Sequence, residues 1–257
     1  MPSYNHLTAL VTLLISDAQL ERLRSRCEVR LAGWGQTGNR LSEDEVVALS
    51  HSTQLLIVGY EPVSARVIAA NPDLRLIACG RGNPVNVDVA DATARGIPVI
   101  HTPGRNALAA AEFTLGLMIN AARNITRGDR ALRAGRYVGT ERAEFAGADP
   151  SPDITWNLDG ESPYKELCGL ELHGRTLGLI GLGHVAEEVA RLARAFGMRV
   201  AAYSFGNDRV HAEALQIELT GLDDLLAQSD FLSVHCRVSP QSRGLLNREA
   251  FAAMKPG

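Results

Sequence analysis

The stretch Thr176-Leu-Gly-Leu-Ile-Gly181-Leu-Gly183-His184-Val185-Ala186 has the pattern of a hydrophobic strand that leads through glycines into a helix. Gly181 permits a tight turn, Gly183 lets the backbone approach a bound group, and Ala186 lets the helix pack close to the strand. Free N–H groups and the positive end of a helix suit a pyrophosphate. The stretch therefore predicts a dinucleotide phosphate site; a glycine turn without a ligand is the alternative, because such turns are common.

The residues after this turn continue the alternation of strands and helices. The sequence predicts further strands at Arg199–Tyr203, Gln216–Leu219 and Phe231–His235, and helices at Val185–Phe196 and Asn247–Met254. An acidic residue at the end of the second strand, where ribose hydroxyls are usually bound, is not evident, because Ser204 occupies that place. Three functional interpretations stay open: Asp208 reaches back to bind a ribose, Ser204 with Arg209 accepts a 2′-phosphate, or the affinity for the cofactor is weakened. The alternative is that these are ordinary polar residues of a solvent-exposed loop.

The first hundred residues show an alternation of the same kind. Predicted strands lie at Leu7–Ile15, near Val29, and at Gln54–Val58, Leu74–Cys79 and Ile97–Ile100. A helix begins near Asp17, Ser42 and Glu45 form a capping box, and another helix closes at Arg95-Gly96. Strands separated by helices indicate a parallel sheet covered on both faces. We therefore expect two α/β domains, residues 1–103 and 104–257.

The segment between the two alternations is helical at first and then irregular. A long helix is predicted from Ala107 to Arg133, broken by Gly116 and Gly128, and we expect it to join the domains. Gly135–Leu172 has no sustained period, which is unusual for a connection of that length. We interpret it as an arm or dimer contact, with a flexible linker as the alternative.

The composition of the 257 residues is that of an ordinary globular protein, with 46% hydrophobic and 21% charged residues and a net charge of −3. No basic excess is present to attract nucleic acid or an anionic membrane. Ala107–Ala122 is too short to span a bilayer, and Met1–Ile15 lacks the features of a signal peptide. The four cysteines are far apart without a C-x-x-C pair, which favours buried thiols in the cytoplasm over a zinc site or disulfides.

Several motifs occur in a recognisable order. They are Gly80-Arg81-Gly82-Asn-Pro84-Val85-Asn86-Val87-Asp88, Thr102-Pro103-Gly104-Arg105-Asn106, Glu112-Phe113-Thr114, Gly169 to Gly183, Phe196-Gly-Met198, Leu222 to Asp230, and Leu245 to Gly257. This order resembles the D-isomer-specific 2-hydroxyacid dehydrogenases, which include phosphoglycerate, glycerate, formate and lactate dehydrogenases. The resemblance spans roughly Leu55 to Gly257. It implies two Rossmann-like domains, a flavodoxin-like substrate domain and an NAD(P)-binding domain, the second incomplete.

The resemblance also implies where ligands bind. The loop Gly80–Gly82 would present backbone N–H groups to a substrate carboxylate, and Arg81 would add a charge, unless it is simply an exposed loop cation. Asn106 and Glu112 match positions at the domain junction, although Asn106 could instead cap the long helix and Glu112 could pair with a cation. The resemblance thus implies a small anionic 2-hydroxy or 2-keto acid as substrate.

On the cofactor side, the resemblance assigns NAD or NADP, with NAD slightly favoured. Gly181, Gly183, His184, Val185 and Ser204 would contact the dinucleotide. Three residues that follow the strand at Phe231–His235 would run past it: Cys236, Arg237 and Val238. Arg237 replaces an expected proline, which changes the local shape of the pocket. By resemblance we also expect a homodimer.

The family transfers hydride with an arginine, a glutamate and a histidine. By resemblance all three lie beyond Gly257, so we expect no catalytic residue in this stretch and no turnover by it alone. Of the histidines present, His101, His184 and His235 have no recognisable carboxylate partner and are read as structural or solvated. The function expected is that of an NAD(P)-dependent 2-hydroxyacid dehydrogenase; a non-enzymatic dinucleotide-binding sensor or interaction module is the alternative, and an inactive gene remnant a weaker one.

Overall fold

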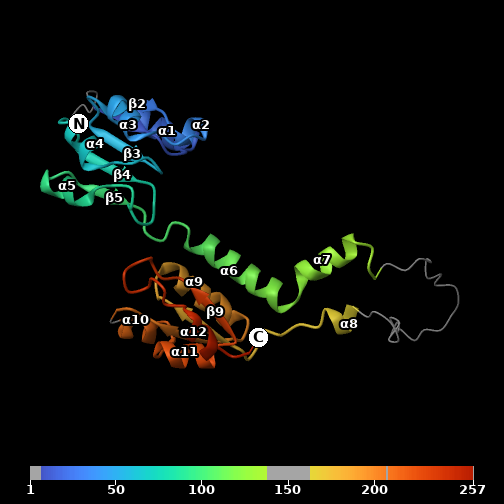
Figure 1. Cartoon of the computed structure of the whole chain (residues 1–257). Helices are drawn as coiled ribbons and strands as arrows, with labels where there is room; N and C mark the ends of the chain where they lie inside the picture. The colour runs from blue at the N-terminus through green and yellow to red at the C-terminus, as the bar shows by residue number, and fades with distance from the viewer. Residues whose placement is uncertain (1–6, 138–162, 207, 257) are drawn as a thin grey trace. The chain divides into compact units, whose positions relative to one another are not determined.

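The computed structural model describes residues 7–137, 163–206 and 208–256. The chain divides into two compact units, Met1–Arg105 (unit 1) and Asn106–Gly257 (unit 2), each containing a parallel β-sheet (Figure 1). The expected α/β class with two parallel sheets is confirmed. Most of the irregular segment Gly135–Leu172 lies outside the described residues. No described helix is long and apolar enough to cross a membrane.

Unit 1 contains a five-stranded sheet in the order β2-β1-β3-β4-β5. Its strands are β1 (Thr8–Val11), β2 (Glu28–Leu31), β3 (Leu55–Val58), β4 (Leu76–Cys79) and β5 (Val99–His101). The helices are α1 (Asp17–Arg24), α2 (Trp34–Thr37), α3 (Glu43–Ser50), α4 (Ala65–Ala70) and α5 (Val89–Ala94). The strand order reverses between β1 and β3, which opens a crevice at their carboxyl ends.

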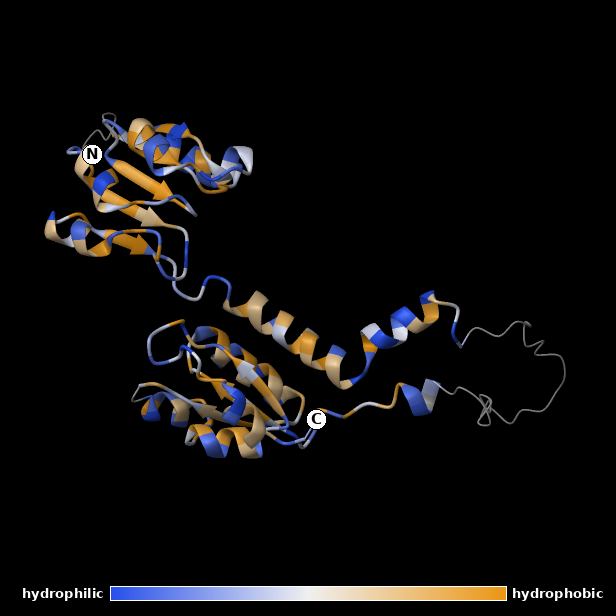
Figure 2. Cartoon of the chain, viewed as in Figure 1, coloured by the Kyte–Doolittle hydropathy of each residue, from blue (hydrophilic) through white to orange (hydrophobic). Residues whose placement is uncertain are grey.

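The core of unit 1 follows from strands that are apolar on both faces. Leu10 packs into one buried cluster, while its neighbours Ala9 and Val11 pack into another, because successive side chains of a strand point to opposite faces. Figure 2 shows the hydrophobic colouring along β3 and β4. The capping box is confirmed: the Glu45 N–H donates to Ser42 Oγ at 3.3 Å, and the Ser42 N–H donates to the Glu45 carboxylate at 2.8 Å.

Unit 2 contains a four-stranded sheet in the order β8-β7-β6-β9. Its strands are β6 (Thr176–Ile180), β7 (Arg199–Tyr203), β8 (Glu218–Leu219) and β9 (Phe231–Val234). The helices are α6 (Ala107–Ala122), α7 (Ile125–Arg133), α8 (Pro163–Glu166), α9 (His184–Ala195), α10 (Arg209–Ala214), α11 (Leu222–Gln228) and α12 (Arg248–Ala253). Every residue of β6 is buried. The strand order reverses between β6 and β9.

The long helix expected at Ala107–Arg133 is two helices, and the prediction that Gly116 and Gly128 break it was wrong. The break lies at Asn124, which adopts left-handed backbone angles with φ 54°. Its side-chain amide donates to the Cys168 carbonyl at 3.1 Å, and the N–H of Leu170 donates to the Ala122 carbonyl at 2.7 Å. Hydrogen bonds to a distant segment therefore end α6, whereas both glycines lie within helices. Instead of only bridging two domains, α6 packs against α9 in the core of unit 2.

Candidate functional site

The glycine turn of unit 2 connects β6 to α9 at the point where the strand order reverses. Gly181 has φ +92°, and a Cβ at this position would lie 2.9 Å from the backbone N and Cα of Cys236. Only glycine fits, because the backbone after β9 approaches the turn that closely. The turn is thus built by contact between two strand ends.

The space beside Gly183 is open. A Cβ at Gly183 would meet no atom within 4 Å, and its backbone angles, φ −121° and ψ −177°, are those of ordinary extended chain. No side chain caps the N-terminus of α9. Within the described residues, the N–H groups of residues 182–186 make no hydrogen bond; the first N–H bond back to the turn is from Glu187 to the Gly183 carbonyl at 3.0 Å. His184 and Val185 therefore contribute free backbone donors.

The end of β7 carries a carboxylate that comes from four residues downstream. Ser204 follows β7, and its hydroxyl donates to the Asp208 carboxylate. The neighbouring Arg209 is exposed and pairs with Glu213 at 3.2 Å. Of the arrangements open from the sequence, the structure thus has Asp208 turned back toward the strand end and Arg209 paired along α10.

The segment after β9 holds the other predicted cofactor residues of unit 2. Cys236 is half-buried against Gly181, whereas Arg237 and Val238 are exposed. His235 shares a hydrogen bond of 2.9 Å with Ser233, and burial lowers the pKa of His235 below its ordinary value. No carboxylate among the described residues contacts His235, which fits the structural reading of this histidine.

In unit 1 the loop Gly80–Gly82 follows β4 and is anchored by β5. The N–H of Thr102 donates to the Arg81 carbonyl at 3.0 Å, and a His101 ring nitrogen lies 3.1 Å from the Gly82 carbonyl oxygen. The N–H of Gly80 is bound to the Val58 carbonyl at 2.8 Å. Within the described residues the Arg81 N–H is bound to Cys79, and the N–H groups of Gly82 and of the following Asn83 make no hydrogen bond. Among the glycines of the loop, the available donor is therefore Gly82.

Asn106, the remaining predicted substrate contact, belongs to unit 2. It occupies the N-cap position of α6, is exposed, and makes no side-chain capping hydrogen bond. The alternative that its side chain caps the helix is therefore not supported. Glu112 is also exposed, and within the described part of the chain no ion pair involves it.

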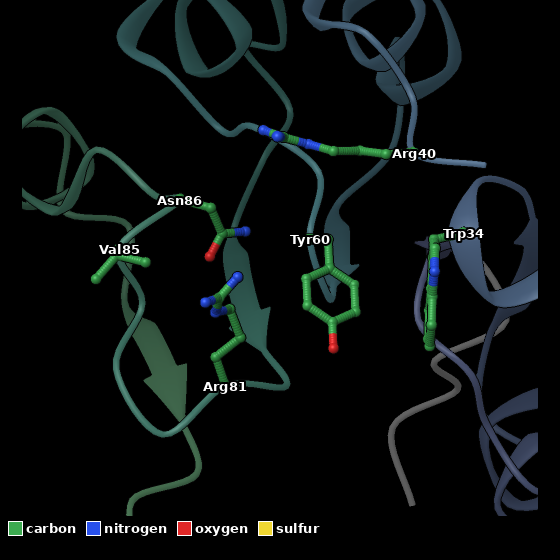
Figure 3. Close-up of a pocket in the computed structure, with 6 residues that line it drawn as sticks. All are labelled: Trp34, Arg40, Tyr60, Arg81, Val85 and Asn86. Carbon is green, nitrogen blue, oxygen red and sulfur yellow. The ribbon is translucent and has the colours of Figure 1, made fainter. Parts of the chain in front are cut away.

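Two adjoining pockets open at the carboxyl ends of the unit 1 strands, where the strand order reverses. The larger, of about 530 Å³, is lined by Trp34, Arg40, Tyr60, Arg81, Val85 and Asn86 (Figure 3). The smaller, of about 230 Å³, is lined by Leu13, Leu14, Trp34, Gly59, Tyr60, Gly80, Arg81 and Arg105. Trp34 and Tyr60 pack edge to face at 4.8 Å, and the Arg81 guanidinium lies 5.3 Å from the Tyr60 ring centre. The predicted loop therefore lines a real cavity.

Glu61 holds the walls of these pockets together from beneath. Its fully buried carboxylate accepts hydrogen bonds from the Thr12 hydroxyl at 2.5 Å and from the N–H groups of Trp34 and Tyr60 at 3.0 and 3.1 Å. Burial raises the pKa of Glu61, but these hydrogen bonds outweigh it and leave the pKa below the ordinary value. The group is ionised near neutral pH, and its charge is directed at Thr12 and two backbone donors.

The sequence reasoning missed the aromatic and charged residues Trp34, Arg40, Tyr60 and Glu61 of this site, and it quoted Asn86 in a motif without giving it a role. Gly33-Trp34-Gly35 was a usable signal, because a tryptophan between glycines right after a strand suggests a special turn. Gly33 has φ +70°, and a Cβ there would lie 2.7 Å from the Glu61 carboxylate. The other residues gave no local signal, because contacts made across the fold place them at the pocket.

Residues 115–257 match the family described as D-isomer specific 2-hydroxyacid dehydrogenase, NAD binding domain. The chain belongs to this family. The chain is 37% identical to a D-3-phosphoglycerate dehydrogenase of Mycobacterium tuberculosis, over 97% of this chain and 42% of the relative. It is 34% identical to a hydroxypyruvate reductase of Thermotoga maritima, over 86% of this chain and 63% of the relative. The chain thus spans less than half of the mycobacterial protein and under two thirds of the second relative.

Solved structures agree with the fold of the chain. A crystal structure of a Thermus thermophilus protein superimposes with a TM-score of 0.77 at 32% sequence identity, over 98% of this chain and 71% of that one. A glyoxylate reductase gives a TM-score of 0.73 at 24% identity, which supports the fold alone. The resemblance stated from the motifs is confirmed.

The glycine turn of unit 2 fits a nicotinamide dinucleotide, NAD or NADP. The open space beside Gly183, the uncapped start of α9 and the free N–H groups of residues 182–186 together suit a pyrophosphate. The Asp208 carboxylate lies at the strand end where a ribose is bound in this type of fold.

Proposed function

We propose that this dehydrogenase interconverts a 2-hydroxy acid and a 2-keto acid by hydride transfer with NAD or NADP. The observation that carries the proposal is the Gly181–Gly183 turn, closed by Cys236 on one side and open at Gly183 on the other. The cofactor supplies the hydride that is exchanged with C2 of the acid. The chain's own residues bind and orient the two reactants.

The proposal gives each unit a role. Residues 104–257 hold the dinucleotide: backbone N–H groups at Gly183, His184 and Val185 bind the pyrophosphate, and Cys236, Arg237 and Val238 pass beside the nicotinamide end. Residues 1–103 hold the acid, with the Gly82 N–H and the Arg81 guanidinium on its carboxylate. Asn106 is assigned to the substrate as well. Free N–H donors and a fixed cation are suited to a carboxylate.

NAD is the proposed cofactor in preference to NADP. Asp208 accepts from Ser204 at the end of β7, which leaves its carboxylate beside the expected ribose hydroxyls. A carboxylate accepts hydrogen bonds from two hydroxyls but repels a 2′-phosphate. Arg209, which could attract that phosphate, is paired with Glu213.

Two further assignments concern assembly and location. We infer a homodimer, because α6 carries large exposed apolar side chains at Leu108, Phe113 and Leu117, of which Phe113 is 68% exposed. A solution mass of one chain by light scattering would contradict this.

We also infer a cytoplasmic location, because all four cysteines are free. The expectation that they are all buried was wrong, since Cys168 is exposed and Cys236 half-buried.

The test of the cofactor site uses Gly183→Val with Gly221→Val as its matched control. Both glycines precede a helix of unit 2 without capping it, and neither has a positive φ. The new side chain at position 183 enters open space, so the fold is kept while the phosphate approach is blocked. Titration with NADH and NADPH, followed by nicotinamide fluorescence, should show binding to the wild type and to G221V and at least a tenfold loss in G183V. Equal binding to G183V and G221V would refute the site.

The test of the acid uses the NADH complex. Hydroxypyruvate, glyoxylate or pyruvate is added, and the fluorescence of bound NADH is followed against acetate as a control without a keto group. A saturable change with the 2-keto acids alone, weakened by Arg81→Met, supports the proposal. The same response to acetate would show that the site does not select 2-keto acids.

A further inference from the structure

Three arginines from separate parts of unit 1 meet around one aromatic surface. Arg40 comes from the segment between α2 and α3, Arg81 from the loop after β4, and Arg105 from the segment after β5. Neither pocket is lined by an acidic residue. Within the described residues none of the three guanidinium groups forms an ion pair. The pockets are therefore lined by cations and not by anions, while the ionised Glu61 lies buried beneath their walls.

Arg81 and Arg105 belong to the end of the pockets that holds the Gly80–Gly82 loop. Both line the smaller pocket, and Arg81 also lines the larger one. Burial raises the pKa of the Cys79 thiol at the end of β4, and the charges of Arg81 and Arg105 partly oppose that rise. Their charge is sufficient for the single carboxylate of a 2-hydroxy acid.

Arg40 is a third cation beyond that need. It lines only the larger pocket, together with Val85 and Asn86. Figure 3 shows its side chain extending across one end of the pocket, with the guanidinium on the side of Tyr60 where Asn86 and Arg81 lie. The Asn86 amide donates to the Glu61 carbonyl at 2.7 Å, so this wall is fixed. The cavity thus has, in Arg40, a cation that comes from outside the Gly80–Gly82 loop and lies at one end of the pocket.

The space and the walls of the larger pocket suit a substrate longer than a simple three-carbon acid. The larger pocket has about 530 Å³, within the range of small-molecule sites. Trp34 and Tyr60 form one wall and are about two fifths exposed, which leaves ring surface for a ligand. Aromatic rings also give the carbon chain of such a substrate an apolar surface to pack on. The buried Glu61 does not line the pocket, because its oxygens are used by Thr12, Trp34 and Tyr60.

We propose that the substrate of this dehydrogenase carries a second anionic group, a carboxylate or a phosphate, which Arg40 binds at the end of the pocket away from the Gly80–Gly82 loop. Arg40 is then a specificity-determining residue that selects dianionic over monoanionic 2-hydroxy acids. The inference rests on the proposed function, because it takes the loop as the site of the reacting carboxylate.

The test uses Trp34 as an internal reporter in the full chain. The chain has two tryptophans, Trp34 and Trp156, so Trp156→Phe leaves the pocket residue as the only one. Fluorescence is followed on titration with two matched pairs, D-malate against D-lactate and D-3-phosphoglycerate against D-glycerate. Each pair differs by one anionic group, and the two pairs distinguish a carboxylate from a phosphate.

We expect the dianion of at least one pair to bind about tenfold tighter than its monoanion. Arg40→Met should remove that advantage, about a tenfold loss, while leaving the monoanion unchanged, and Arg40→Lys should keep part of it. Arg75→Met is the control, because Arg75 is an exposed arginine just before β4, at the opposite end of the strands from the pocket. It should change neither affinity.

Three outcomes would overturn the inference. Equal binding of dianion and monoanion in both pairs would leave the proposed function standing and remove the second anion site. An equal loss of both affinities in R40M would assign Arg40 to the reacting carboxylate instead. If none of the four acids binds while NADH still does, the substrate role of the loop is refuted as well.

Discussion

Gly181 combines two constraints that are separate at most glycines. Its positive φ disfavours any side chain, and the Cys236 backbone fills the place of a Cβ. Gly174 has the first constraint only, with φ +74° and no atom within 4 Å of a Cβ. Comparing substitutions at Gly181 and Gly174 therefore distinguishes the cost of backbone strain from the cost of the close approach between two strand ends.

Gly181→Ala should therefore lower the free energy of unfolding by about 3 kcal/mol and abolish NADH binding, because the β9 end must move away from the turn. Gly174→Ala should cost about 1 kcal/mol and leave NADH binding intact. Urea unfolding and NADH titration measure both effects. Equal costs for the two substitutions would show that the contact with Cys236 adds no strain.

Asp208 carries the proposed preference for NAD. Asp208→Ser should weaken NADH binding and shift the ratio of NADH to NADPH affinity about tenfold toward NADPH, because the carboxylate that binds hydroxyls and repels phosphate is gone. Asp223→Asn removes the same charge from the exposed start of α11 and should leave the ratio unchanged. An unchanged ratio in D208S would contradict the role of Asp208.

At the scale of elements, the boundary between α6 and α7 depends on side chains that reach other segments. Asn120 accepts from the N–H and hydroxyl of Thr126 at 2.8 and 2.7 Å, which caps the start of α7. Asn124 links the break to the carbonyl of Cys168. A helix boundary of this kind is not marked by a glycine or proline in the sequence, so it is not predicted from the sequence.

Substitutions at a glycine inside α6 and at the asparagine between α6 and α7 should change the stability of the protein in opposite directions. Gly116→Ala should stabilise the protein by about 1 kcal/mol, because Gly116 lies inside α6 with open space for a methyl group. Asn124→Ala should destabilise it by about 2 kcal/mol through backbone strain and lost hydrogen bonds. Thermal unfolding distinguishes them; a destabilising G116A would mean that this face of α6 is covered in the assembled protein.

At the scale of the whole molecule, stability at acid pH depends on the buried Glu61. Its pKa is lower in the folded state than the ordinary value of 4.5, so the folded protein binds fewer protons than the unfolded chain. The resulting stabilisation is fully present above that value and is lost as the pH falls through the folded pKa. Unit 1, whose pocket walls Glu61 joins, should be affected first.

Glu61→Gln should remove about 3 kcal/mol near neutral pH, because an amide places a donor among three donors. The variant should also lose part of the decline in stability below pH 4.5. Glu28→Gln, at an exposed glutamate on β2, is the control and should keep the wild-type pH profile. Parallel profiles for wild type and E61Q from neutral to acid pH would contradict the assignment.

The sequence by itself determined the class of fold, the alternation of strands and helices, the capping box at Ser42 and the glycine turn at Gly181. Each of these depends on residues close together in the chain: apolar periodicity, a helix cap, or a glycine between a strand and a helix. The family motifs extended this to the Gly80–Gly82 loop. Local chemistry is readable without knowing how the segments meet.

The tertiary structure alone decided the pocket, the buried charge and the helix break. Thr12 and Glu61 are 49 residues apart in the chain, and Trp34 and Glu61 are 27 apart, yet they share one carboxylate. Arg40 faces the same cavity as Arg81 only because parallel strands bring their carboxyl ends to one edge of the sheet. Such contacts depend on packing between distant segments, and no local pattern of residues encodes them.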